Sequence, residues 1–201
     1  MKKILILSVA VLLAASLSSF LPTKSELSIY DNFIRLHVIA NSDTDEDQAL
    51  KLEVRDRILE FVGERLAGAE TKADAEEKME KLLPEIEAAA ASVIGDADRD
   101  YTVTATLSEE NYPRRSYGTV TLPAGKYTSL RVIIGEGAGH NWWCVLFPRM
   151  CTRPAVTDEA QKEEFTEAGF TPSQYKIITD SENTRYVVKF RLIEIIRGLF
   201  D

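Results

Sequence analysis

The residue types best suited to chemistry or binding are concentrated in one short block of the chain, 135–151. Both tryptophans, both cysteines and one of the two histidines lie within it. Cys144 could serve as a nucleophile if His140 or His37 lay within hydrogen-bonding distance to act as its base. Such an imidazole needs a third group to orient it, and the candidates are Asn41, Asn141 and Asp43. The simpler interpretation is that both histidines hold local structure through hydrogen bonds.

The same block does not match a known metal or phosphate motif. The spacings of the two histidines and two cysteines fit no standard zinc site, so we expect no metal ion. Gly135, Gly137 and Gly139 allow close approach of the backbone, but no Lys-Ser or Lys-Thr pair follows them as in a phosphate-binding loop. We therefore expect no cofactor.

Cys144 and Cys151 leave three alternatives open. Six residues separate them and Pro148 favours a bend, so a disulfide is sterically reasonable in an oxidising compartment. They could instead be two separate buried thiols, since free cysteine is often a small core residue. The third alternative is a reactive thiol.

Two further pairs of residues are candidates for contact with a partner. In an extended segment Trp142 and Trp143 point to opposite faces, so one ring can be buried while the other is left to shield a turn or anchor a contact. Arg35 and His37 share one face of a predicted strand, where they are either exposed to solvent or part of a polar surface that meets a partner.

Periodic patterns predict the elements that position these residues. The stretch 33–40 is rich in β-branched residues and predicts a strand. A helix should follow as far as Leu66, capped by Ser42 or Asp43. A second apolar stripe with helical spacing runs from Thr71, paired with Asp74 as a cap, to Gly95. Pro84 lies inside this stripe and should kink or split the helix.

The second half of the chain changes to a period of two. Alternation predicts strands at 101–107, 117–122, 130–134 and 143–147. The stretch 157–168 is acidic and weakly helical, 172–183 is expected to be mostly loop, and 188–199 has helical spacing with a plausible strand start at Tyr186. Helices followed by strands predict an α+β fold: a single domain with two N-terminal helices packed on a mostly antiparallel sheet, closed by a C-terminal helix or strand-helix.

The first residues have the pattern of an export signal. Lys2 and Lys3 precede an apolar run, with small residues near Ser16, as in a secretory signal peptide. If it is retained, the run is barely long enough to anchor the chain in a bilayer. We therefore divide the chain into a signal peptide or anchor at 1–21, a linker at 22–32 and an α+β domain at 33–201. The domain should lie outside the cytoplasm, with membrane contact only through the N-terminal segment.

Charge is unevenly distributed along the chain. The net charge of −8 and a pI near 5.0 argue against nucleic-acid binding, which needs a basic surface. From residue 43 to residue 110 there are 20 acidic and 8 basic side chains, whereas from 111 to the end 12 are basic and 10 acidic. The acidic half is either a solvated helical pair or a charged docking face.

Three stretches together resemble the stage II sporulation protein R family of endospore-forming bacteria. They are Arg35-Leu-His-Val-Ile-Ala-Asn-Ser-Asp43 with its helix 48–56; Tyr117-Gly-Thr-Val-Thr-Leu-Pro-Ala-Gly125; and 130–135 leading into Gly139-His-Asn-Trp-Trp-Cys-Val-Leu-Phe-Pro148. The resemblance covers nearly all of the chain from Asn32 onward, and 141–148 is its most specific part. Arg149 and Met150 depart from it, since a second proline and a leucine are expected there.

The resemblance implies a signalling role rather than catalysis. Such proteins are made in the forespore and exported to the space between the two sporulation membranes. There they activate a membrane-embedded aspartic protease of the mother cell, which removes the pro-sequence of sporulation sigma factor E. This implies an activator, not an enzyme, whose candidate partner-binding residues are Arg35, His37, Asn41, Asp43, Gly139, His140, Asn141, Trp142 and Trp143. The alternative hypothesis is a wall-acting hydrolase that uses Cys144 with His37 or His140.

Overall fold

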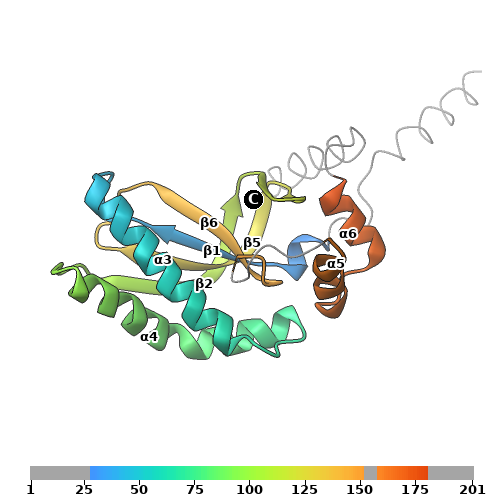
Figure 1. Cartoon of the computed structure of the whole chain (residues 1–201), viewed down its shortest axis with the longest axis horizontal. Helices are drawn as coiled ribbons and strands as arrows, with labels where there is room; N and C mark the ends of the chain where they lie inside the picture. The colour runs from blue at the N-terminus through green and yellow to red at the C-terminus, as the bar shows by residue number, and fades with distance from the viewer. Residues whose placement is uncertain (1–27, 152–157, 181–201) are drawn as a thin grey trace, which may run out of the picture. The chain divides into compact units, whose positions relative to one another are not determined.

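The computed structural model describes residues 28–151 and 158–180, and it confirms the α+β class (Figure 1). The described residues belong to two compact units. The larger comprises 30–112 and 126–172, and the smaller contains 28–29, 113–125 and 173–180 among its described parts. The predicted signal peptide or anchor at 1–21 and the predicted C-terminal helix or strand-helix lie outside the described residues.

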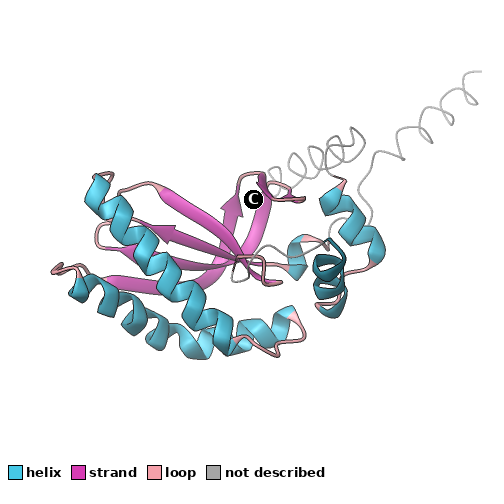
Figure 2. Cartoon of the chain, in the orientation of Figure 1, coloured by secondary structure: helices cyan, strands magenta, loops and turns pink. Residues whose placement is uncertain are grey.

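The larger unit is built on a four-stranded sheet (Figure 2). Its strands, in spatial order, are β2 (Val103–Tyr112), β5 (Gly125–Ile134), β1 (Ile34–Ile39) and β6 (Asn141–Phe147). β1 runs parallel to β5 and antiparallel to β6. The amide of Gly135, after β5, donates to the carbonyl of Thr102, before β2, so these two neighbours run antiparallel. The sheet is therefore mixed, with one parallel pair at its centre.

Two long helices, α3 (Asp45–Arg65) and α4 (Lys72–Asp96), cover one face of this sheet (Figure 1). The predicted cap of α4 is confirmed, because Thr71 accepts a hydrogen bond from the Asp74 amide. The predicted cap of α3 is wrong: Thr44 accepts from the Asp47 amide, whereas Ser42 and Asp43 bond elsewhere. Pro84 does not divide α4, whose buried Met79 and Ile86 continue the packed stripe on both sides of it.

Alternation along the strands separates the sheet into two faces. Trp142 packs under Arg55 of α3, so even-numbered residues of β6 face the helices, as do their neighbours Leu36 and Val38 in β1. The opposite face is called here the His37 face, and it carries Arg35, His37, Glu110, Tyr112, Ser129, Arg131, Asn141 and Trp143. These are the polar and aromatic residues on which the functional argument depends.

An aromatic cluster closes one end of the larger unit. Phe33 packs edge-on against Phe165, at the end of α5 (Asp158–Glu167), and against Phe170. Tyr30, in the short 3-10 helix η1 (Tyr30–Asn32), packs against Tyr127 with the two rings tilted by 44°, and it is buried. Tyr30 falls within the predicted linker at 22–32 and is packed into the core of the larger unit.

The smaller unit differs from the sequence-based expectation at two places. The single strand predicted at 117–122 is a hairpin of β3 (Arg115–Tyr117) and β4 (Val120–Leu122), which turns at Gly118 with a φ of +60°. The predicted loop at 172–183 contains a helix, α6 (Pro172–Thr179).

Of the described helices, none combines the length and the apolar character that a membrane span requires.

Candidate functional site

His37 occupies the centre of the His37 face and is held on both sides. Its Nδ1 lies 2.8 Å from Oε1 of Glu110 in β2, and its Nε2 lies 2.8 Å from Oδ1 of Asn141, the first residue of β6. If the ring carries both protons, it donates to both oxygens. If it carries one proton, on Nδ1, it donates to Glu110, and Nε2 then accepts a hydrogen bond that the NH2 group of Asn141 can donate once its amide is turned round. In either form the ring ties three strands together.

Glu110 is itself fixed by neighbours on the same face. Its Oε2 accepts from the Ser129 hydroxyl at 3.0 Å, and that hydroxyl is 2.7 Å from the Tyr112 hydroxyl. Arg131 lies beside it, with Nε 3.7 Å from Oε1. The carboxylate therefore supports His37 from a preorganised position rather than turning freely in solvent.

Arg35, one of the predicted contact residues, lies deeper in the same face. It is 0% exposed, so its side chain does not reach the surface in this arrangement. The Nε donates to the Cys144 carbonyl at 3.0 Å, and the guanidinium lies 4.1 Å and 5.1 Å from the ring centres of Tyr112 and Tyr127. Carbonyl and ring contacts offset part of the cost of burying this charge, and Arg35 supports the face from below.

The two tryptophans lie on opposite sides of the sheet, as the extended backbone predicts. The Trp143 ring lies 5.5 Å from the His37 ring at an angle of 34°. Trp142 lies instead on the helix side, where the Arg55 guanidinium sits 4.9 Å from its ring centre. Both rings are partly exposed, but only Trp143 belongs to the His37 face.

A second polar cluster links the start of α3 to the sheet, and it is organised around Asp47. This carboxylate is buried and accepts from Ser42 Oγ at 2.6 Å and from Asn41 Nδ2 at 2.8 Å. These two hydrogen bonds, from Ser42 first and Asn41 second, lower the pKa of Asp47 below its usual value and outweigh the opposing effect of burial. Asp47 thereby fixes the 41–44 loop that follows β1.

The loop that precedes β6 docks on the 41–44 loop. Gly139 donates to the Ala40 carbonyl at 3.0 Å, and a Cβ atom at this position would collide with the backbone of Ser42. Asp43 accepts from both the amide and the ring of His140. Among the predicted contact residues, Asn41, Asp43, Gly139 and His140 are thus brought together here, beside the His37 face but not on it.

Lys51 of α3 completes this junction from below. Its Nζ donates to the His140 carbonyl at 2.9 Å and to Gln48 Oε1 at 2.6 Å. Burial lowers the pKa of Lys51, and nearby Asp43 partly offsets that shift. The residue orders the backbone where β6 begins, one position before Asn141.

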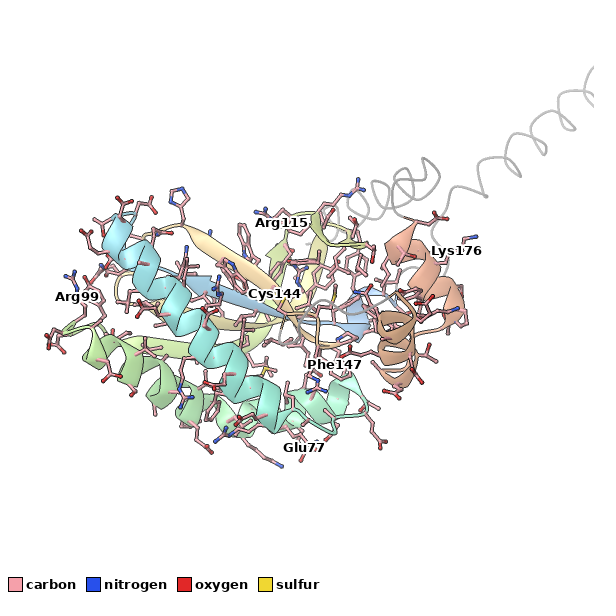
Figure 3. The ribbon with its side chains drawn as sticks, viewed as in Figure 1. Glu77, Arg99, Arg115, Cys144, Phe147 and Lys176 are labelled. Carbon is pink, nitrogen blue, oxygen red and sulfur yellow. A yellow bond between two sulfur atoms is a disulfide. The ribbon has the colours of Figure 1, made fainter. Side chains whose placement is uncertain are left out.

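Cys144 and Cys151 are joined in a disulfide, with 6.3 Å between their Cα atoms. This is one of the three alternatives that the sequence leaves open. Cys144 lies in β6 (Figure 3), opposite Leu36, and therefore on the helix side of the sheet, whereas His37 lies on the other side. The bridged sulfur and the opposed orientation contradict the hypothesis of a Cys144 nucleophile activated by His37.

The larger unit also has a hollow of about 440 Å³ at the bend that follows β6. It is lined by Phe147, Pro148 and Arg149, by the turn between α3 and α4, and by the end of α5. Its titratable residues, apart from Arg149, are carboxylates.

Within 28–151 and 158–180, no group of three or more His, Cys, Asp or Glu is placed to hold a metal ion.

Four residues of the His37 face were not among the predicted contacts: Glu110, Tyr112, Ser129 and Arg131. The predicted strand ended at Leu107, whereas β2 continues to Tyr112. Continuing the alternation would have placed Glu110 and Tyr112 on one face. Their meeting with His37 depends on the order β2-β5-β1, which a local pattern does not specify.

Comparison with known proteins adds three findings. The family model described as stage II sporulation protein R matches residues 30–157. A protein of Bacillus subtilis (strain 168) named stage II sporulation protein R is 31% identical over 187 residues, which cover 86% of this chain and 84% of that protein. No solved structure matches.

Proposed function

The chain belongs to the stage II sporulation protein R family, and from this premise we propose that it is an exported signal that activates a membrane-embedded aspartic protease. It is a sporulation protein by family. On this proposal it is made in the forespore and secreted into the intermembrane space. The protease of the mother cell then removes the pro-sequence of sigma factor E. The chain itself makes and breaks no bond.

The observation that carries this proposal is the construction of the His37 face. His37, Glu110 and Ser129 form a hydrogen-bonded chain across the sheet, and the tilted Trp143 ring packs against the imidazole. His37 and Ser129 are buried, so the accessible part of the His37 face consists of Glu110, Arg131, Asn141 and Trp143. An accessible layer held from below in this way suits recognition, because its side chains lose little freedom on binding. Tryptophan is also among the residues most enriched at the energetic centre of interfaces.

Activation by contact has a simple thermodynamic requirement. A ligand shifts a receptor toward its active arrangement only if it binds that arrangement more tightly than the inactive one. A preformed surface satisfies this requirement more readily than a flexible segment, because it can fit one arrangement and not the other. The disulfide between Cys144 and Cys151 fits a role in binding, because neither sulfur is a free thiol that could act as a nucleophile.

Co-expression in a bacterium that does not sporulate tests the proposal. The cells would produce the protease, the sigma factor E precursor and the full chain, and processing would be followed by immunoblot. We expect processing with the exported chain and none when residues 1–21 are deleted so that the chain stays inside. Absence of processing with the full chain, or equal processing without export, would refute the proposal.

The two tryptophans provide a matched pair for locating the surface. Trp143→Ala should abolish processing, because it removes the ring from the His37 face, whereas Trp142→Ala removes a ring from the helix side and should retain most of the signal. Thermal melts of both purified variants check that each is folded. Equal loss of processing in two folded variants would exclude the His37 face as the contact.

A further inference from the structure

Arg131 stands out on the His37 face because its donors are unused. It lies in β5 directly beside His37 in the parallel register, and 43% of its side chain is exposed. Its Nε is buried without a hydrogen-bond partner, and the described residues accept no hydrogen bond from its guanidinium. A guanidinium has five N–H donors in a planar fork that matches a carboxylate.

The nearest carboxylate does not satisfy this fork. Glu110 Oε1 is 3.7 Å from Arg131 Nε, beyond hydrogen-bonding distance, and the same oxygen is 2.8 Å from His37 Nδ1. The other oxygen accepts from Ser129. Glu110 is therefore held toward His37 and pairs with Arg131 only at long range, so the exposed part of the Arg131 side chain can meet a group from outside.

The charge of the His37 face also differs from that of the helix side. On the four strands the positions that share this face hold two arginines, the buried Arg35 and the half-exposed Arg131, against one acid, Glu110. The two helices α3 and α4 together carry 14 acidic and 7 basic side chains. An acidic partner would be repelled by the helix side and attracted to the His37 face.

We propose that the His37 face binds an acidic segment of the protease, with a carboxylate on Arg131 and an apolar side chain against Trp143. This inference rests on the proposed function and adds the chemistry of the partner. Arg131 and Trp143 flank His37 on neighbouring strands, so their backbones are about 10 Å apart. The segment should therefore present an acidic and an apolar side chain at about that separation.

The test measures binding of the purified protease in detergent to the wild-type chain and to three variants. Arg131→Gln should weaken binding about tenfold and reduce its dependence on salt, because a half-exposed charge contact is lost. The affinity of Arg131→Lys should lie between those of the wild type and Arg131→Gln, because lysine keeps the positive charge but lacks the planar pair of donors. Arg57→Gln is the matched control, because Arg57 is similarly exposed on α3, and it should stay within about twofold.

The outcomes separate the two proposals. If the wild-type chain does not bind the protease, the proposed function fails. If the wild-type chain binds and Arg131→Gln binds equally well, or if Arg57→Gln is weakened as much, the inference about the acidic segment is overturned.

A second measurement does not need the protease. A synthetic peptide with Glu and Leu three residues apart, and its Glu-to-Gln version, would be titrated into the isotope-labelled chain. We expect the first peptide, and not the second, to shift the NMR signals of the Arg131 side chain and the Trp143 indole. No shift, or equal shifts with both peptides, would overturn the inference.

Discussion

Replacing Gly139 with alanine should destabilise the chain strongly, because this residue lies against the backbone of the neighbouring loop. An added Cβ would approach within 2.6 Å of the Ser42 carbonyl carbon, closer still to its oxygen, and within 2.9 Å of the Ala40 Cβ. Since these are mainly backbone atoms, no side chain can rotate away. The two loops would have to separate by about 1 Å to restore ordinary contact distances.

The cost follows from what that separation breaks. Gly139 donates to the Ala40 carbonyl at 3.0 Å and Ala138 to the Asn41 carbonyl at 3.1 Å. Each bond contributes about 1 kcal/mol, and the residual crowding costs about 1–3 kcal/mol. We therefore expect Gly139→Ala to lower the free energy of unfolding by about 3–5 kcal/mol.

Gly95→Ala is the matched control for this change. Nothing lies within 4 Å of an added Cβ at Gly95, which is inside α4. The same substitution there should raise the free energy of unfolding by about 0.5–1 kcal/mol, because glycine weakens a helix. Urea titrations of both purified variants, followed by circular dichroism, measure the two effects. A loss below about 1 kcal/mol for Gly139→Ala would refute the argument that the loops are rigidly docked.

Three further predictions follow from the clusters around the sheet. Asp47→Asn should cost about 1–3 kcal/mol at neutral pH, because it weakens the buried hydrogen bonds. Since the pKa of Asp47 is lowered, its stabilisation is complete above the unfolded value of 3.8 and is lost as pH falls through the lower folded pKa. Urea titrations at several acidic pH values should show this loss in the wild type and a flatter curve in the variant; parallel curves would contradict it. The Cys144→Ala, Cys151→Ala double variant should lose about 2 kcal/mol of stability and still trigger processing if it folds, so a folded but silent variant would count against a contact-only role. His37→Gln should reduce processing and shift the emission of Trp143, measured in a Trp142→Phe background, and an unchanged spectrum would contradict the stacking.

Local sequence patterns predicted much of this architecture. The β-branched run at 33–40 became β1, and the two stripes with helical spacing became α3 and α4, since both signals depend on which side of one element is buried. Thr71 was also identified as a helix cap, because the cap depends only on Asp74, which is three residues away in the sequence. The opposite orientation of Trp142 and Trp143 needed only the pleat of a strand.

Features that depend on contacts across the fold were not predicted. The helix at 172–179 has too few residues for a clear period, and its buried Ile177 and Ile178 depend on tertiary packing. The parallel pairing of β1 with β5 is a matter of topology, and it is this pairing that places Arg131 beside His37. Glu110 approaches His37 from 73 residues away in the chain, which no short motif encodes.

We propose that the chain acts by contact through the His37 face and not by catalysis. The most direct measurement is the rate at which purified protease in lipid vesicles cleaves the sigma factor E precursor as the chain is added on the extracytoplasmic side. We predict a rate that rises and saturates with the wild-type chain and stays at its basal value with Trp143→Ala. A rate that does not respond to the wild-type chain, or cleavage of the precursor by the chain without the protease, would contradict the account.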